Sequence, residues 1–469
     1  MADGTLAAAA PSRVRRILAL AAPTTLLAGT QVAALLIEPW LAARQGTLAL
    51  AGWAVVLPFA LLLGQMSAGA MGGGVVSAIA RALGAGRREE AAALATHALV
   101  IACAGAALFA IPLAIFPRSI LGLIGGADAA AAGAAYSAWL FGAGALPAWL
   151  TNTLASILRG GGRHALAARG VIGGWVAFPP LAWLLMEPLG MGLAGAGLAF
   201  ALTMTGAAAV MAAVVMAGGA GFTPQLRTPL SAALFHRILS VGLVACAMAT
   251  IANLATILVT ARIAAYGPAA VAGYGISARI EFLMIPLAFG VGSALTALVG
   301  RAVGAGDWAE ARRIAWTGAA LALGVTAAIA IPVAIFPAAT AAAFTDDPAV
   351  RAIATRALAI IAWAMPGFGV GMALYFAAMG AGRMTWPVAA GLSRILLAVG
   401  GGWLLGDLMG FGLAGQFVAV ALGTALTAGL AVGAGVAAGA RDIRQGPSPV
   451  VGAQPSGDAG GGAVGEEHA

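Results

Sequence analysis

The chain has few charged residues, two cysteines and no lysine. Charged residues make up 9% of its 469 positions, whereas soluble domains contain about 25%. Hydrophobic residues make up 62%, and 68 residues are glycine. Glycine and other small residues let helices pack closely in lipid. The composition therefore argues against a water-soluble fold and predicts an all-α integral membrane protein.

The same absences argue against most enzymatic and nucleotide-binding functions. All 24 basic residues are arginine, so the Walker A lysine is missing and ATP-driven transport by this chain alone is not expected. Cys103 and Cys246 lie in apolar segments and give no disulfide pattern. The four histidines form no metal-ligand pair. We therefore expect no metal, no cofactor and no enzymatic activity.

Long apolar stretches recur along the whole chain, and many exceed the roughly 20 residues that cross a bilayer core. Proline interrupts several of them, which membrane helices tolerate. The pattern predicts twelve transmembrane helices, at residues 17–38, 47–70, 94–116, 132–155, 165–186, 191–215, 237–260, 270–296, 314–336, 352–377, 385–406 and 412–438.

The chain also repeats itself after 220 residues. The sequence RALGAG at 81–86 returns as RAVGAG at 301–306. Three further segments return at the same offset, namely residues 111–117, 160–163 and 192–195. Each repeat contains six predicted spans, so both enter from the same side and are related by an axis along the membrane normal. Two pseudo-symmetric six-helix lobes in an apolar chain indicate a secondary transporter, because such proteins place one substrate site between repeats.

Composition changes mark the expected boundaries. The stretch around residues 218–229 is a natural linker, and the chain end is rich in glycine, proline and serine, as disordered segments are. The predicted parts are a cytoplasmic N-terminal segment (1–16), an N-terminal lobe (17–217), a cytoplasmic linker (218–236), a C-terminal lobe (237–440) and a disordered cytoplasmic tail (441–469).

The distribution of arginine predicts the orientation. If the N-terminus is cytoplasmic, seventeen of the 24 arginines lie in inside segments and five in outside loops. Cytoplasmic loops carry such an excess, so both termini are expected inside. The apolar run that starts at Ile17 is too long for a typical signal peptide and is interpreted as a retained first helix. Short arginine-bearing loops fit membrane topology better than nucleic-acid binding.

Three of the charged residues within or at the edge of predicted spans are the first candidates for function. Glu38 ends the first span; burial would favour its neutral form, so it could exchange a proton or bind a cation, or it could simply reach the outer surface. Arg279 and Glu281 lie in the eighth span, two residues apart, and therefore need not pair with each other. Glu281 could act in ion coupling and Arg279 in substrate binding, or both charges could belong to a structural network.

Two other acidic residues and several uncharged ones complete the candidates. Glu187 and Asp407 are repeat partners at the ends of spans and are expected in solvated loops. Polar and aromatic residues within spans could bind substrate or bridge helices; they are Gln31, Trp53, Asn152, Asn253 and Tyr274.

These residues resemble a known family. Residues 272–281 read AGYGISARIE, residues 300–306 read GRAVGAG, and residues 158–162 read LRGGG. Together with the twelve spans, they resemble the MATE family, the multidrug and toxic compound extrusion transporters, over about residues 12–440. The resemblance implies two lobes around a central cleft. It also implies export of organic compounds, often lipophilic cations, as protons or sodium ions enter.

The resemblance also bears on Glu38, which aligns with an acidic residue on the first helix, usually Asp, that is tied to coupling. The chain departs from the family elsewhere. Residues 250–253 of the seventh span read TIAN and carry no carboxylate, and residues 178–182 of the fifth read FPPLA. The resemblance places the chain in the bacterial inner membrane, as a functional monomer with a small-molecule substrate and no nucleic acid.

Three functions remain open. The favoured one is a multidrug antiporter with alternating access. A flippase for lipid-linked saccharides would share the architecture, but it should place several basic residues in its spans, and only Arg279 and Arg394 lie well inside one. A membrane enzyme or channel-like scaffold would need a polar constellation that the sequence does not contain.

Overall fold

The computed structural model describes residues 12–445. These residues are helical almost throughout and contain no strand. Most of the predicted N-terminal segment, 1–16, and tail, 441–469, lies outside the described residues. Where the two parts overlap with them, Arg13 already begins the first helix and the last helix runs to Gln445.

The first half of the chain forms eight α-helices and two π-helical stretches. They are α1 (Arg13–Arg44), α2 (Thr47–Gly64), η1 (Gln65–Met71), α3 (Gly72–Gly84), α4 (Arg88–Ile115), α5 (Pro117–Ser137), η2 (Ala138–Ala143), α6 (Ala145–Gly160), α7 (His164–Met186) and α8 (Gly192–Met216).

The second half follows the same plan with different interruptions. Its elements are α9 (Ala232–Ala264), α10 (Pro268–Gly304), α11 (Trp308–Ile335), α12 (Pro337–Ala342), α13 (Pro348–Ile361), the 3-10 turn η3 (Ala362–Ala364), α14 (Met365–Ala381), α15 (Thr385–Ile395), η4 (Leu396–Gly401), η5 (Trp403–Leu408) and α16 (Gly412–Gln445).

Twelve segments of the described chain are long and apolar enough to cross a membrane, which confirms the predicted number. Several are longer than predicted: the second runs on to Gly84 and the eighth to Gly304. Each continues until a glycine with positive φ, Gly86 at 75° and Gly306 at 78°, turns the chain. The arginines just before these turns therefore lie in helices and not in the loops where we expected them.

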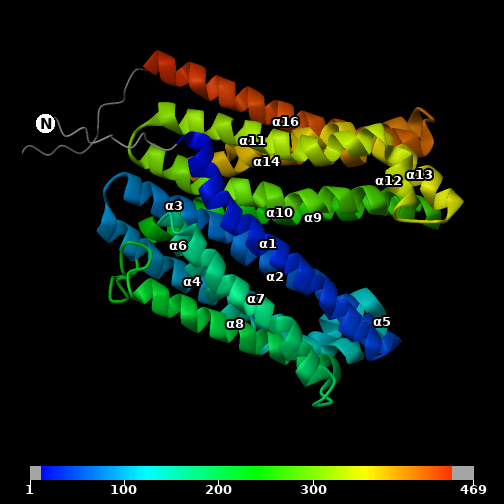
Figure 1. Cartoon of the computed structure of the whole chain (residues 1–469), viewed down its shortest axis with the longest axis horizontal. Helices are drawn as coiled ribbons and strands as arrows, with labels where there is room; N and C mark the ends of the chain where they lie inside the picture. The colour runs from blue at the N-terminus through cyan, green and yellow to red at the C-terminus, as the bar shows by residue number, and fades with distance from the viewer. Residues whose placement is uncertain (1–11, 446–469) are drawn as a thin grey trace, which may run out of the picture.

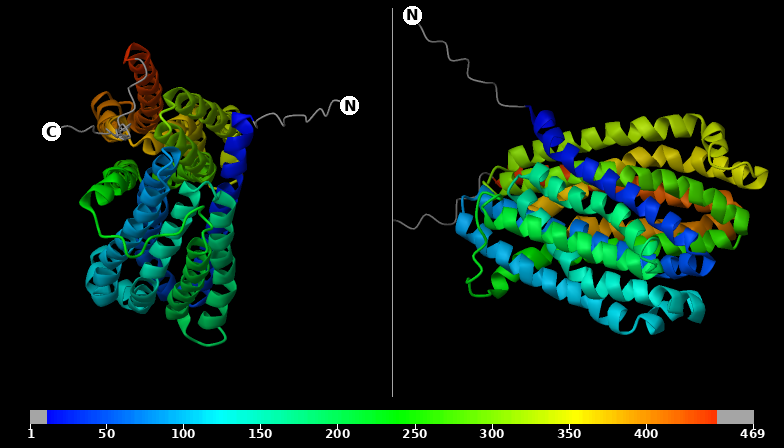
Figure 2. Two further views of the ribbon diagram at one scale, coloured as in Figure 1. Left: turned by 90° about the vertical axis from the view of Figure 1, so that its left-hand side faces the viewer. Right: turned by 60° about the horizontal axis from the view of Figure 1, so that its bottom comes forward.

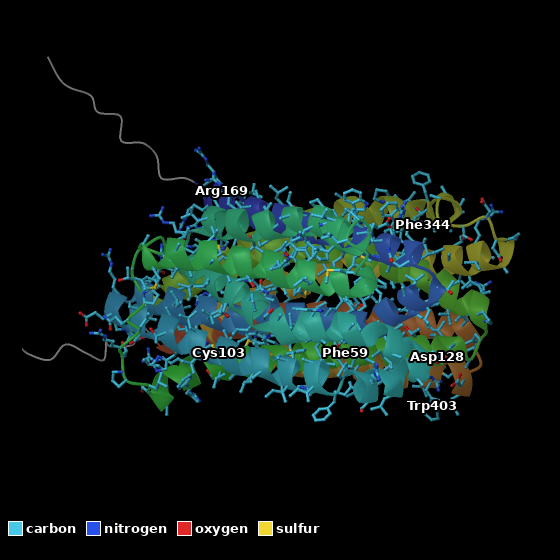
Figure 3. All side chains as sticks on the ribbon, turned by 90° about the horizontal axis from the view of Figure 1, so that it is seen from below. Phe59, Cys103, Asp128, Arg169, Phe344 and Trp403 are labelled. Atoms are coloured by element: carbon cyan, nitrogen blue, oxygen red, sulfur yellow. The ribbon has the colours of Figure 1, made fainter. Side chains whose placement is uncertain are left out.

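The helices run side by side between two ends of the molecule (Figure 2). The arginine-rich end holds the turns at 84–88, 160–164, 217–231, 304–308 and 381–385. The opposite end holds the turns at 44–47, 186–192, 264–268, 335–348 and 408–412. In Figure 3, Arg169 lies toward the first end, and Asp128 and Trp403 lie at the second.

Helices α1–α8 form one group and α9–α16 another, and the two groups diverge away from the arginine-rich end (Figure 1). We call them the N-terminal and C-terminal lobes. Many large apolar side chains, such as Leu36 (70% exposed) and Leu123 (88%), point outward. Such a surface suits lipid and not water.

The first helix of each lobe crosses between them. Ile17 of α1 packs in the core of the C-terminal lobe, whereas Leu41 of the same helix packs in the core of the N-terminal lobe. Helix α9 does the reverse, with Ile238 in the N-terminal core and Ile263 in the C-terminal core. Figure 1 shows α1 running diagonally from one lobe to the other. Helix α1 is thus part of the cores of both lobes.

Candidate functional site

Glu38 in α1 is the one acidic residue whose side chain is buried among those described, with 5% of it exposed. The O–H of Tyr136, itself 1% exposed, donates a 2.5 Å hydrogen bond to Glu38 Oε1. The indole N–H of Trp53 lies beside the same carboxyl group and is buried without a hydrogen-bond partner in the described chain. Two neutral donors thus face a carboxyl group that no described cation pairs with.

Glycines place the two aromatic side chains there. A Cβ at Gly52 would stand 2.7 Å from the nitrogen of Gly133, and a Cβ at Gly133 would stand 2.6 Å from the oxygen of Gly52. Real Cβ atoms do not approach so closely, so only glycine lets α2 and α5 touch here. Trp53 follows the first glycine, and Tyr136 lies one turn after the second. Close helix packing therefore builds the surroundings of Glu38.

A second group of polar side chains lies near the middle of the spans. The amide of Asn152 donates a 2.8 Å hydrogen bond to the hydroxyl of Ser67, within the N-terminal lobe. The amide of Asn253 on α9 donates one of 2.8 Å to Gln65 Oε1 in the π-helical stretch η1. This second bond joins α9 of the C-terminal lobe to η1 of the N-terminal lobe. Both of its side chains are exposed. Gln31 is half-buried on α1.

The C-terminal lobe has a charged pair of its own. Arg394 of α15 donates a 2.7 Å hydrogen bond to Glu281 of α10, and both side chains are partly exposed. The guanidinium also lies over the ring of Phe368, 5.7 Å from its centre. Tyr274 is buried and stacks on Phe417, with ring centres 6.4 Å apart. The two lobes therefore differ: one encloses an unpaired carboxyl group, and the other holds an ion pair.

Arg279 does not join this pair. Its side chain is exposed on α10, and Glu281 turns instead to Arg394, as expected for residues two positions apart in a helix. The predicted candidates thus separate into a group around Glu38, a group at mid-depth and the ion pair of the C-terminal lobe.

The lobes touch most closely near the arginine-rich end, through equivalent residues of the two repeats. A Cβ at Gly84 would stand 2.9 Å from the carbonyl carbon of Arg301, and a Cβ at Gly304 would stand 2.8 Å from that of Arg81. In both cases the carbonyl oxygen is closer still. Helices α3 and α10 therefore cross backbone to backbone.

Side chains reinforce that crossing. Ser77 of α3 donates a 2.6 Å hydrogen bond to the carbonyl oxygen of Met379 in α14. The guanidinium of Arg81 rests on Gly382, whose φ of 72° and missing Cβ leave room for it. In the other direction, Arg301 lies against Gly162, the repeat partner of Gly382. The structure thus closes the space between the lobes at this end.

Ion pairs at the opposite end also follow the repeat. Arg44 donates hydrogen bonds of 2.7 and 3.1 Å to Glu187. Arg262 pairs with Asp407, which also accepts a 2.9 Å bond from Tyr266. The Arg44 guanidinium holds the pKa of Glu187 below its ordinary value. As expected, both carboxylates lie at the ends of their spans with side chains partly exposed to solvent, 23% for Glu187 and 41% for Asp407. In addition, each meets the arginine at the end of its lobe's first helix.

Sequence reasoning missed Tyr136, Gln65 and Arg394 as members of these groups. Tyrosine is rare here, with four in the chain, so a tyrosine within an alanine-rich span was a usable signal. Gln65 lies within an apolar run and gave the same kind of signal. Arg394 was recognised within a span, but its partner depends on how α10 and α15 meet. No group of three or more His, Cys, Asp or Glu in the described chain could hold a metal ion.

Comparison with known proteins agrees with this architecture. The family model MatE matches the chain twice, at residues 23–184 and 243–404. The two matches are offset by 220 residues, which confirms the internal repeat.

Solved structures share the fold. A transporter of the MOP superfamily from Pyrococcus furiosus is 21% identical, with a TM-score of 0.85 over 93% of this chain and 98% of that one. The Vibrio cholerae MATE transporter VcmN in its bent form is 21% identical, with a TM-score of 0.84 over 92% and 98%. A multidrug resistance MATE family transporter in an outward-facing conformation is 22% identical, with a TM-score of 0.84 over 92% and 97%.

Proposed function

The chain belongs to the MATE family of membrane transporters, and we propose that it exports small organic compounds, often cationic and lipophilic, in exchange for protons or sodium ions. The observation that carries this proposal is the enclosed Glu38 carboxyl group, with Tyr136 as its donor and no ion pair to any arginine that the structure describes. A buried carboxylate without a counter-charge is costly in a membrane, so such groups commonly serve ion pathways.

The exchange cycle follows from that cost. When the N-terminal lobe seals around Glu38, loss of water favours the protonated form; when the lobe opens to water, the proton leaves. Tyr136 stabilises the ionised form by donating its hydrogen bond. A single carboxyl group is enough for one proton, whereas a sodium ion would need further oxygen ligands around it, so we favour proton coupling.

Helix α1 supports a link between this event and alternating access. It carries Glu38 in the N-terminal lobe, and its other half packs on α10 in the C-terminal lobe through Ile17 and Ala21. A ligand moves a conformational equilibrium only by binding the two states with different affinity. A proton that binds Glu38 more tightly in one state therefore acts on both lobes through the one helix that packs in each.

Few fixed polar groups are available to a substrate between the lobes. Gln31, Gln65 and Asn253 lie near the middle of their spans, within mostly apolar stretches of sequence. Such a surface favours broad specificity for lipophilic compounds. We also propose that the arginine-rich end, with both chain termini, faces the cytoplasm of a bacterial inner membrane, since positive loops prefer that side.

The direct test is ethidium efflux from bacterial cells that lack their own major pumps. Wild type, Glu38→Gln and the matched control Glu89→Gln, an exposed acidic residue on α4, are compared at equal expression. We expect efflux from wild type and Glu89→Gln that a protonophore abolishes, and none from Glu38→Gln. Efflux that survives Glu38→Gln overturns the role of Glu38, and efflux that follows the sodium gradient overturns proton coupling.

Absence of efflux from the wild type with several cationic dyes would contradict the multidrug proposal. In that case, a dedicated exporter such as a flippase for lipid-linked saccharides becomes the better explanation.

A further inference from the structure

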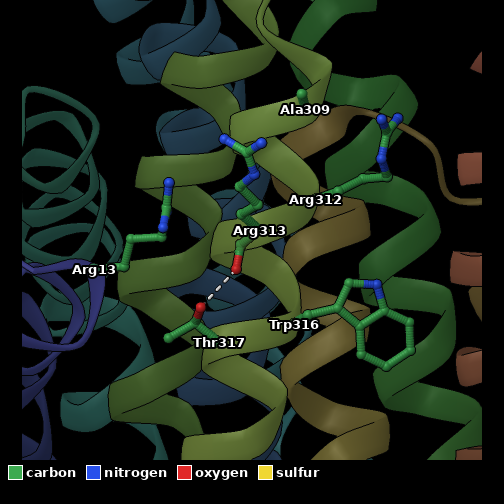
Figure 4. A pocket seen from close by; sticks show the side chains of 6 residues that line it. All are labelled: Arg13, Ala309, Arg312, Arg313, Trp316 and Thr317. Carbon is green, nitrogen blue, oxygen red and sulfur yellow. Dashed lines mark hydrogen bonds between the residues drawn. The ribbon is translucent and has the colours of Figure 1, made fainter.

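A cavity of about 460 Å³ opens between α1 and α11 at the arginine-rich end. This volume lies in the range of sites that bind small molecules, about 300–1,000 Å³. Its lining consists of Arg13, Ala309, Arg312, Arg313, Trp316 and Thr317. Figure 4 shows the arginines above and the indole of Trp316 one turn further along α11. Three of six lining residues are therefore permanently cationic.

The cavity has more positive than negative charge. Arg13 donates hydrogen bonds of 2.9–3.2 Å to Glu310, which also lies 3.5 Å from Arg16. Arg313 is exposed, and its guanidinium makes no hydrogen bond or ion pair with the residues that the structure describes. Glu310 thus serves two arginines of α1, while Arg313 has no partner in this part of the chain.

The cavity also lies near the ends of its two helices, where a membrane-spanning helix meets the lipid headgroups. It is formed by the first turns of two membrane-spanning helices. Deeper along α11, Leu323 (43% exposed) lies seven residues after Trp316, on the same face of the helix, and presents apolar surface. Trp316 lies between these levels, as tryptophan does at membrane interfaces. Cationic groups above, an indole in between and exposed leucine below match the layers of a phospholipid.

We propose that this cavity binds the phosphate of an anionic phospholipid, such as phosphatidylglycerol, from the surrounding leaflet. Arg13 and Arg313 contact the phosphate, because guanidinium groups bind phosphate oxygens with paired hydrogen bonds. One acyl chain lies along Leu323. The inference rests on membrane embedding and not on which compound the protein transports.

Binding there acts on the helix that joins the lobes. The phosphate competes with Glu310 for Arg13, the residue at which α1 begins. It also bridges α1 to α11 through Arg313. An anionic lipid therefore replaces a direct ion pair by a bridged contact between the crossing helix and the C-terminal lobe.

The test measures lipid retention by native mass spectrometry of the purified full chain, with phosphatidylglycerol or phosphatidylcholine added. Basic residues near a membrane surface contribute about fivefold each to the binding of anionic lipid. We expect Arg13→Gln/Arg313→Gln to lower phosphatidylglycerol affinity about 25-fold. Glu310→Gln should raise it, because a competing carboxylate is lost. Arg169→Gln, an exposed arginine on α7, is the matched control and should bind as wild type does.

Equal phosphatidylglycerol affinity in the double variant and wild type would overturn the proposal, and so would equal retention of phosphatidylcholine. Displacement of the lipid by inorganic phosphate at comparable concentration would show a site for free anions and would also overturn it. Lower affinity in the Arg169→Gln control would mean that total charge, and not this cavity, decides binding. None of these readouts depends on transport.

Discussion

The contact between Gly84 and Arg301 gives the sharpest test of how the lobes move. In the structure α3 and α10 cross so closely that a Cβ at Gly84 meets the backbone of the other lobe. The substitution Gly84→Ala adds that single carbon atom. The obstacle is backbone and not the flexible end of a side chain, so the two helices themselves have to separate.

The cost can be judged from the geometry. The carbonyl carbon of Arg301 would lie 2.9 Å from the new atom, whereas ordinary contacts begin at 3.4 Å, and the oxygen is nearer still. Overpacking of this kind costs about 1–3 kcal/mol. The state closed at the arginine-rich end therefore loses about 5- to 150-fold in population relative to a state in which this crossing is open. Gly304→Ala, the repeat partner, should have a similar effect.

The assay measures the distance between spin labels across the arginine-rich end. Cys103 and Cys246 are first replaced by serine, and labels are attached at exposed positions, Glu89 of α4 and Ala309 of α11. We expect a longer-distance population in Gly84→Ala that is small or absent in the parent.

The matched control is Gly206→Ala on α8. A Cβ there meets nothing within 4 Å, and alanine favours helix by up to about 1 kcal/mol over glycine. Its distances should equal those of the parent. Unchanged distances in the double variant Gly84→Ala/Gly304→Ala would refute the claim that this crossing closes the lobes.

Three further results are expected. Tyr136→Phe removes the hydrogen bond to Glu38, worth about 1.5–3 kcal/mol for a charged acceptor, so the pH at which efflux is half-maximal should rise. Arg44 lowers the pKa of Glu187, so this ion pair contributes to stability above the unfolded pKa of Glu187. That contribution is lost as the pH falls through the lower folded pKa. In Glu187→Gln, the melting temperature should therefore depend less on pH in that acid range. Arg394→Gln leaves its carboxylate partner unpaired in the C-terminal lobe and should lower both thermal stability and efflux.

Each of these has its own control and contrary outcome. An unchanged pH profile in Tyr136→Phe would remove the tyrosine from the coupling group. If the melting temperature of Glu187→Gln falls with acid as steeply as that of wild type, other carboxylates cause the loss of stability. If Arg394→Gln loses efflux but the paired variant Arg394→Gln/Glu281→Gln regains it, the ion pair serves structure and neither residue carries the coupling ion.

Much of the fold could be predicted because the membrane imposes one local rule on every span. A segment that crosses lipid must satisfy its backbone within itself, so apolar length alone predicts a helix. The repeat of residues 81–86 at 301–306 needed only the sequence. The helix ends were less accurate, because α3 and α10 extend beyond their apolar stretches until Gly86 and Gly306 turn the chain.

The site was only partly predictable. Glu38 stood out because a carboxylate within apolar sequence is rare. Trp53 was a separate candidate, for substrate binding or helix bridging, with no predicted link to Glu38. Trp53 and Tyr136 meet because of the glycine contact between α2 and α5. Tyr136 then reaches Glu38, 98 positions away in the sequence. Likewise, Glu281 was a candidate from sequence, but only the packing of α15 on α10 selects Arg394 over Arg279 as its partner.

The sequence by itself determined what each helix had to bury or expose: apolar spans, their number, their repetition and the few charges placed within them. These properties follow from the free energy of each residue in lipid or water, which depends on local composition. Only the tertiary structure decided which charges are paired, which carboxyl group is enclosed, and which end of the molecule is closed. Those outcomes depend on backbone approaches of a few ångströms between helices far apart in the chain, at Gly52 and Gly133 and at Gly84 and Gly304, which no local pattern encodes.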